Sequence, residues 1–289
     1  MNHLYYEIIF LINVIVWSAS FILTKTVVES VSAFNLISYR FVIAFIIVSV
    51  FSIRKFRNID REVIKSSAKL GTILYLAYLF QTIGLKYTTA TKAAFINSLI
   101  VIFVPLILLF TKGKKLNKIT LFICFANIIG IGLLTLNYDL TINLGDFLML
   151  IAAAFFGLHI IVVGKVSSLG KNLLIGTLQF GFLSLISITF SIAFEPLEIY
   201  TDSSFWIPMM ILSIFCTAIP YMVQIYIQKV VGEERISLLF TAEPVFAAII
   251  AYFVAGEILT PKEFVGALVI FLSLNIESIY KKFKLHEVG

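Results

Sequence analysis

The sequence is poor in charged residues for its length. Asp, Glu, Lys and Arg make up 13% of its 289 residues, whereas 60% are apolar; an average soluble domain is about one quarter charged. The mean hydropathy is +1.04. A soluble fold of this size cannot enclose so much apolar surface, but lipid can cover it. The composition therefore excludes a disordered chain, a soluble nucleotide-binding fold and a sizeable soluble domain on either side of a membrane.

Cysteine and the common catalytic motifs are also scarce. Cys124 and Cys216 both lie inside apolar runs, so they predict neither a metal site nor a disulfide framework. There is no Gly-x-x-x-x-Gly-Lys-Ser/Thr loop, no His-Glu-x-x-His, no Gly-x-Ser-x-Gly and no intramembrane Asp pair. We therefore expect no ATP hydrolysis by that route, no enzyme activity, no cofactor and no metal.

The chain contains ten apolar runs, each long enough to cross a bilayer as a helix. Together they predict an all-α integral membrane protein. The first run is not followed by a cleavage site of small residues, so we expect a retained helix rather than a signal peptide. The runs lie near 5–24, 34–53, 70–86, 91–111, 119–136, 146–165, 173–194, 205–228, 236–254 and 262–280.

Basic residues fall on alternate loops between these runs. With the N-terminus in the cytoplasm, the inside loops and the tail from 281 hold 17 Lys and Arg residues, and the outside loops hold 4. This asymmetry predicts ten spans with both termini cytoplasmic, in the plasma membrane of a bacterium. It also explains the net charge of +6 without any nucleic-acid partner.

The two halves of the chain resemble each other weakly but in order. An offset of 143 positions places 86–92 on 229–235 and Phe103 on Phe246, and an offset of 139 places Arg40 on Gln179. Since each half has five spans, the second half enters the membrane from the opposite side, which gives an inverted repeat typical of secondary transporters. The predicted units are a first repeat over 5–136, a second repeat over 146–280 and a cytoplasmic tail over 281–289.

Several motifs together resemble the drug/metabolite transporter superfamily, EamA type. The resemblance covers about residues 8–278 and implies ten helices, cytoplasmic termini and the export or uptake of small metabolites, without naming one. In one departure, the counterpart of Glu243-Pro244 is Ile100-Val101, where the family normally carries Pro as well. The motifs are the segments 79–98, 243–251 and 256–260, with Gly266, Trp17-Ser18, Arg40-Phe41 and Gly145-Asp146.

Polar side chains recur at helical spacing in three of the runs, and such faces turn toward a bundle interior because polar groups are costly in lipid. Asn13, Trp17 and Ser20 form one of these stripes. They predict a polar cavity with aromatic walls; the alternative is that they only tie helices together. The candidate substrate-binding residues are Asn13, Trp17, Ser20, Tyr78, Gln81, Asn97, His159, Tyr221 and Gln224.

Three further residues are candidates for coupling or gating. Glu243 lies six residues into the ninth run, roughly 9 Å from its cytoplasmic end; it could bind a cation, take a proton or stabilise a broken helix. Arg40 could meet an anionic group of the substrate, form a gate or tie helices together, and Gln179 is its counterpart. His159, one of the substrate-binding candidates above, could also carry a proton; the alternative is a histidine that only satisfies its hydrogen bonds in the core.

The sequence thus predicts a secondary transporter or facilitator for a small organic metabolite, such as an amino acid, an aromatic compound or a drug-like compound. Export by alternating access is the expected mechanism, with or without proton coupling. The alternatives are a flippase for a lipid-linked or amphipathic substrate and, more remotely, a channel or an intramembrane enzyme. The expected partners are the substrate and the lipid bilayer, and the chain is expected to be a monomer or weak dimer.

Overall fold

The computed structural model describes residues 3–112, 118–135, 142–195 and 198–286, and these residues form helices joined by short turns. The prediction of an all-α membrane protein is confirmed. In chain order the helices are α1 (His3–Val28), α2 (Ala33–Ser52), η1 (Ile53–Asn58), α3 (Arg61–Leu85), α4 (Ala90–Asn97), α5 (Ile100–Lys112), α6 (Lys118–Thr135), α7 (Leu144–Ser167), α8 (Asn172–Phe194), α9 (Ser203–Ser213), η2 (Ile214–Ala218), α10 (Ile219–Val231), α11 (Glu233–Leu239), η3 (Phe240–Ala242), α12 (Glu243–Ala255) and α13 (Pro261–His286).

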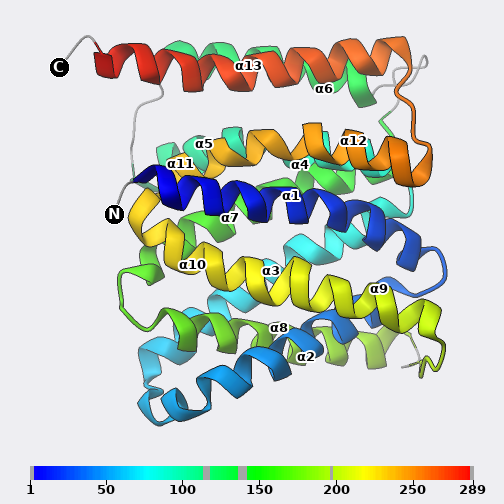
Figure 1. Cartoon of the computed structure of the whole chain (residues 1–289), viewed down its shortest axis with the longest axis vertical. Helices are drawn as coiled ribbons and strands as arrows, with labels where there is room; N and C mark the ends of the chain where they lie inside the picture. The colour runs from blue at the N-terminus through cyan, green and yellow to red at the C-terminus, as the bar shows by residue number, and fades with distance from the viewer. Residues whose placement is uncertain (1–2, 113–117, 136–141, 196–197, 287–289) are drawn as a thin grey trace.

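The helices run side by side across one bundle (Figure 1). Within the described residues, eight helical segments are long and apolar enough to cross a bilayer. Four of them are composite: α2 with η1, α4 with α5, α9 with η2 and α10, and α11 with η3 and α12. The remaining two helices, α6 and α13, pack against each other at one edge of the bundle. This arrangement corresponds to the ten predicted spans.

Helix α1 begins and α13 ends at the same end of the bundle, on the left in Figure 1. We call this the terminal end, and the other the opposite end. The predicted segment between the repeats, 137–145, lies largely outside the described residues, as do residues 287–289 of the predicted tail. The earlier part of that tail, up to His286, continues α13.

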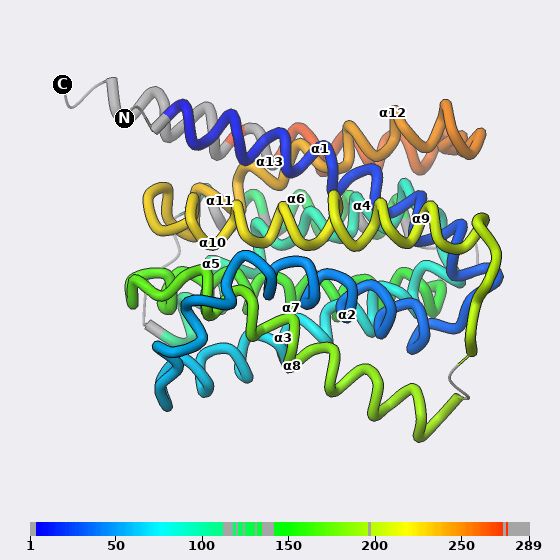
Figure 2. Tube along the Cα trace, turned by 60° about the horizontal axis from the view of Figure 1, so that its bottom comes forward, coloured from blue at the N-terminus to red at the C-terminus, as the bar shows by residue number. Residues whose placement is uncertain are grey.

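Helix packing follows the pattern of an inverted repeat. The contacts of α1 with α10 and α12 match those of α7 with α3 and α5, and the contact of α2 with α9 matches that of α8 with α3. The pairs α2–α8 and α6–α13 join each helix to its own counterpart (Figures 1 and 2). With an offset of 139, each buried residue of α1 falls on a buried residue of α7.

The third span starts earlier than the sequence indicated. The predicted run began at 70, but α3 begins at Arg61, because the Asp60 side chain accepts a hydrogen bond of 2.9 Å from the backbone N–H of Val63. Charged residues in this stretch look like a loop in the sequence, but they lie on a capped helix. Lys171 pairs with Asp60, and this ammonium group together with the Val63 N–H holds the pKa of the Asp60 carboxyl below its usual value.

Two spans are interrupted at equivalent places. Helix α12 starts at Glu243 after the short η3 turn, and α5 starts 143 residues earlier, at Ile100, after a turn at Ser98 and Leu99. At the first break the N–H of Ile102 bonds the carbonyl of Leu99 at 2.8 Å, a tighter pattern than an α-helix. Both repeats therefore break the same helix, although only the second has a proline at the break.

Candidate functional site

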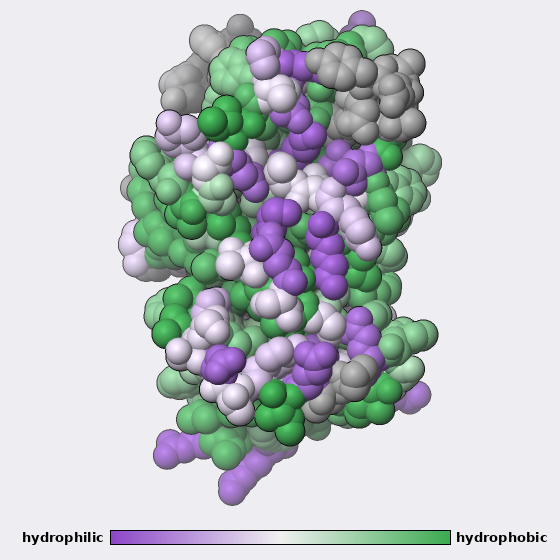
Figure 3. All heavy atoms as spheres, turned by 90° about the vertical axis from the view of Figure 1, so that its right-hand side faces the viewer, coloured by the Kyte–Doolittle hydropathy of each residue, from purple (hydrophilic) through white to green (hydrophobic). Residues whose placement is uncertain are grey.

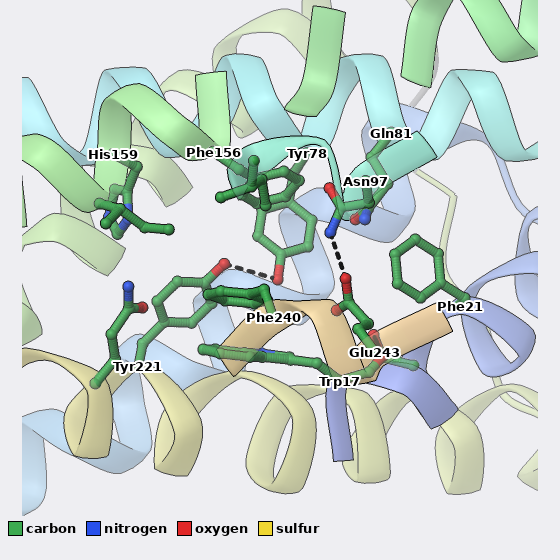
Figure 4. Close-up of a pocket in the computed structure, with 14 residues that line it drawn as sticks. Trp17, Phe21, Tyr78, Gln81, Asn97, Phe156, His159, Tyr221, Phe240 and Glu243 are labelled. Carbon is green, nitrogen blue, oxygen red and sulfur yellow. Dashed lines mark hydrogen bonds between the residues drawn. The ribbon is translucent and has the colours of Figure 1, made fainter. Parts of the chain in front are cut away.

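A cavity lies between the two repeats (Figure 4). Its walls come from α1, α3, α4, α5, α7, α10, η3 and α12. All of its lining residues are at least nine-tenths buried. They are Trp17, Ser20, Phe21, Tyr78, Gln81, Asn97, Ile100, Phe156, His159, Ile160, Tyr221, Gln224, Phe240 and Glu243.

The lining consists of seven pairs of equivalent positions. An offset of 139 relates the residues of α1 to those of α7, and an offset of 143 relates α3, α4 and α5 to α10, η3 and α12. The cavity therefore lies on the axis that relates the repeats, which is where a secondary transporter with inverted repeats holds its substrate. The pairs are Trp17–Phe156, Ser20–His159, Phe21–Ile160, Tyr78–Tyr221, Gln81–Gln224, Asn97–Phe240 and Ile100–Glu243.

Aromatic rings form the middle of the cavity. Trp17 stacks on Phe240, with ring centroids 5.3 Å apart and ring planes 14° apart, and its ring is 5.3 Å from that of Tyr221. The Tyr221 hydroxyl donates a hydrogen bond of 3.1 Å to the Tyr78 hydroxyl. Flat rings next to hydroxyl and amide groups can hold a molecule that is apolar on one side and polar on the other.

Glu243 and Asn97 meet at the two helix breaks. Asn97 is the last residue of α4, Glu243 is the first of α12, and the Asn97 Nδ2 donates a hydrogen bond of 2.7 Å to Glu243 Oε2 (Figure 4). The positive end of the α12 dipole favours a carboxylate at this place. The span itself starts at Glu233, so Glu243 lies about 15 Å along it by helical rise rather than the predicted 9 Å.

Glu243 is 2% exposed, and no basic side chain among the described residues lies within ion-pair distance of its carboxylate. The Oδ1 atom of Asn97 is buried without a hydrogen-bond partner in the structure. A buried carboxylate without a basic partner costs free energy when it is ionised, and binding a proton or another cation removes that cost. This pair is therefore the candidate coupling group of the cavity.

Arg40 does not line the cavity, but it contacts Tyr78, which does. The side chain is fully buried, its Nε donates a 2.7 Å hydrogen bond to the Thr217 hydroxyl, and its Nη2 reaches the Tyr78 hydroxyl at 3.4 Å and the Cys216 carbonyl at 3.3 Å. Its guanidinium carbon also lies 4.6 Å from the centre of the Tyr78 ring. Arg40 thus ties α2 to α3 and η2, in agreement with the structural interpretation of this residue.

The backbone carbonyl of Cys216 can accept the hydrogen bond from Arg40 because Pro220 lies four residues later. A proline has no N–H to bond the carbonyl four residues earlier, and the wide π-turn η2 lies at the same place. Trp17 Nε1 also donates to this carbonyl, at 3.1 Å. The local break in the eighth span therefore orients both Trp17 and Arg40.

Asn13 and Gln179 are likewise outside the cavity. Asn13 Nδ2 donates a 3.1 Å hydrogen bond to the Pro220 carbonyl, and Gln179 Oε1 lies 3.2 Å from His159 Nε2. The structure therefore brings together nine of the twelve predicted site residues around one cavity and places Asn13, Arg40 and Gln179 behind its wall. That these nine residues bind a substrate stays a prediction.

Five lining residues were not predicted, and all are apolar: Phe21, Ile100, Phe156, Ile160 and Phe240. Apolar residues in a membrane span carry no signal of their own, since most of them face lipid or pack. The repeat itself contains the missing signal. Each of the five is the counterpart of another lining residue, and the offsets applied to Trp17, Asn97 and Glu243 point to three of them, Phe156, Phe240 and Ile100.

Polar contacts join the two repeats at both ends of the bundle. At the terminal end Arg235 forms two hydrogen bonds with Glu7, of 2.7 and 2.8 Å. At the opposite end Glu257 accepts from the backbone N–H groups of Ala90 and Thr91, and Lys92 pairs with Glu263. Figure 3 views that end and shows hydrophilic side chains gathered along its middle, with hydrophobic ones on both flanks.

Comparison with known proteins finds similar transporters and a solved structure with the same fold. A protein of Archaeoglobus fulgidus described as an uncharacterized transporter is 28% identical over 96% of this chain and 87% of its own length. A second uncharacterized transporter of that organism is 24% identical over 85% of this chain and 88% of its own length. One crystal structure of a protein shares the fold, with a TM-score of 0.68 at 14% identity, over 95% of this chain and 96% of that chain.

The family profile matches the chain twice, once for each five-helix half. The matched residues are 4–136 and 143–276, which together make up nearly the whole sequence. This chain, a multi-pass membrane protein with a cavity between two inverted halves, belongs to the EamA-like transporter family.

Proposed function

We propose that the chain is a secondary transporter that moves a small organic metabolite across the plasma membrane of a bacterium by alternating access of its two repeats. The buried cavity lining made of seven equivalent pairs carries this proposal. Because the pairs are related by an inverted repeat, a rocking motion of one half against the other would expose the same site to each side in turn.

The lining limits the chemistry of the substrate. Trp17, Phe240 and Tyr221 offer ring faces, while Gln81 and Gln224 offer amide groups that both donate and accept hydrogen bonds. An aromatic compound or an amino acid with one apolar and one polar part fits this combination best.

Glu243 supports coupling of transport to protons. Its carboxylate lies in the cavity wall, is hydrogen-bonded to Asn97 and lacks a basic partner among the described residues. A proton carried inward on this group would drive the substrate outward, so export is the direction that we propose.

Flux through purified protein in proteoliposomes tests the proposal. A panel of labelled amino acids, aromatic metabolites, cationic drugs and a lipid-linked sugar is measured with and without an imposed pH gradient. Saturable flux of one class that rises with the gradient supports coupled transport, whereas saturable flux that ignores the gradient supports a facilitator and removes the role of Glu243. Flux of a lipid-linked substrate alone would instead support a flippase.

A further inference from the structure

The ion pair at the terminal end joins the first helix of one repeat to the fourth span of the other. Arg235 on α11 and Glu7 on α1 are 228 positions apart in the chain, and both nitrogens that contact the carboxylate lie within 2.8 Å of it. Such a two-point contact between Arg and a carboxylate is the strong, well-oriented form of an ion pair. It joins the two repeats on the terminal side of the cavity.

The repeat places a second pair of opposite charges at the opposite end. The offset of 139 takes Glu7 to Asp146 on α7, and the offset of 143 takes Arg235 to Lys92 on α4. Helices α4 and α7 are in contact, as are α1 and α11. The two pairs therefore stand at equivalent positions, with the acid and the base on equivalent helices.

The second pair is not formed in the structure. Lys92 pairs instead with Glu263 on α13, and Asp146 accepts a hydrogen bond from the Thr88 hydroxyl through Oδ1. The other oxygen of Asp146, Oδ2, is buried without a hydrogen-bond partner, and the whole residue is 1% exposed.

We propose that Glu7–Arg235 and Asp146–Lys92 are equivalent gate pairs that form in alternation, one closing each end of the cavity. In the structure the terminal pair is formed, while Lys92 is held by Glu263 and Asp146 has an unused oxygen. When the terminal pair opens, Lys92 leaves Glu263 and bonds that oxygen. The inference rests on the proposed alternating access and names the residues that close each end.

Other charges near the opposite end do not take the place of Lys92. The Lys25 ammonium donates to the carbonyls of Leu85 and Thr88, at 3.2 and 2.7 Å, and its counterpart at an offset of 139 is Gly164. Glu257 bonds the backbone at the start of α4. Of these groups, only Lys92 combines the equivalent position with a partner that it can exchange.

Pairs of engineered cysteines test the alternation directly. In a chain with Cys124→Ser and Cys216→Ser, one variant carries Lys92→Cys with Asp146→Cys and another carries Glu7→Cys with Arg235→Cys. A short, cleavable thiol crosslinker is added to the purified protein, and mass spectrometry identifies the linked peptides. Lys92→Cys with Glu263→Cys is the matched control, because the structure already joins those two residues.

We expect both gate pairs to crosslink, and each crosslink to lower substrate flux at least tenfold until the linker is cleaved. A crosslink at Glu7 and Arg235 together with the Lys92–Glu263 control, but none between Lys92 and Asp146, would overturn the inference. The crosslink is scored without any substrate, so this failure would leave the proposed transport function standing.

A second measurement needs no substitution and covers the case in which Asp146→Cys does not fold. A zero-length carbodiimide joins a lysine to a carboxylate that it contacts. Applied to the unaltered chain, it should join Lys92 to Glu263 in some molecules and Lys92 to Asp146 in others. Products that contain only the Lys92–Glu263 link would contradict the exchange.

Discussion

The hydroxyls of Tyr78 and Tyr221 lie 3.1 Å apart, and the two residues are 143 positions apart in the chain, at equivalent places in the two repeats. A residue that contacts its own counterpart must lie close to the axis that relates the halves. The hydrogen bond therefore marks the centre of the cavity and crosses the boundary between the repeats. A rocking motion of one repeat against the other acts directly on this contact, because each repeat contributes one of the two hydroxyls.

The two tyrosines should contribute unequally to stability. In Tyr221→Phe one donor is lost, and we expect the free energy of unfolding to fall by about 1 kcal/mol. In Tyr78→Phe the acceptor of both Tyr221 and Arg40 is lost, and we expect a fall of about 1–3 kcal/mol. Apparent Tm values in detergent check the order, and a larger loss for Tyr221→Phe would contradict the arrangement described.

Replacing Glu243 by glutamine should uncouple transport from protons. The amide oxygen can still accept the hydrogen bond from Asn97, but the side chain no longer takes up a proton. We expect flux of the substrate to continue down its own gradient and to be the same with and without a pH gradient.

Glu29→Gln is the matched control for this measurement, since Glu29 is an exposed acid beyond the end of α1. It should respond to the pH gradient as the unaltered chain does. If Glu243→Gln retains the full response to the gradient, another group carries the proton and the proposed role of Glu243 is wrong.

Arg40→Lys should be strongly destabilising although it keeps the charge. The ammonium group cannot bond the Thr217 hydroxyl, the Tyr78 hydroxyl and the Cys216 carbonyl with the fixed fork of a guanidinium. We expect a loss of about 2–3 kcal/mol because buried acceptors lose their donors. An unchanged apparent Tm would show that Arg40 is not the structural tie that its contacts indicate.

Trp17 offers a direct report of ligand binding. The chain contains two tryptophans, and Trp206 lies at the start of α9, with its Nε1 bonded to the Tyr200 carbonyl. In Trp206→Phe the remaining indole lines the cavity, so a bound substrate should quench or shift its emission. The reverse variant, Trp17→Phe, should show no change with the same ligand; a change there would mean that the ligand binds elsewhere.

Much of the fold and the cavity could be predicted because the membrane imposes simple rules. Apolar run length gave most span boundaries to within a few residues, and polar residues at helical spacing had to face the interior. Trp17, Tyr78, Gln81, Tyr221 and Gln224 were found in this way, and all five line the cavity.

Tertiary packing decided the rest. Which side of a polar helix meets the cavity depends on the neighbouring helix. The sequence therefore left open whether Arg40 is a gate or a tie between helices, and the structure places its side chain against η2 behind the cavity wall. The break before Ile100 could not be predicted because no proline lies at it. The start of α3 at Arg61 could not be predicted because the charged residues around it are typical of a loop. Glu7 and Arg235, far apart in the chain, become partners only after the repeats pack.

Labelling of one cysteine from both sides of the membrane tests alternating access most directly. Ser20 is small, lines the cavity and is 8% exposed, so Ser20→Cys in a chain without Cys124 and Cys216 places one thiol there. A membrane-impermeant thiol reagent is added to right-side-out and to inside-out vesicles. We predict that the thiol reacts from both faces and that substrate protects it on each. Reaction from one face only, or from neither, would contradict the account.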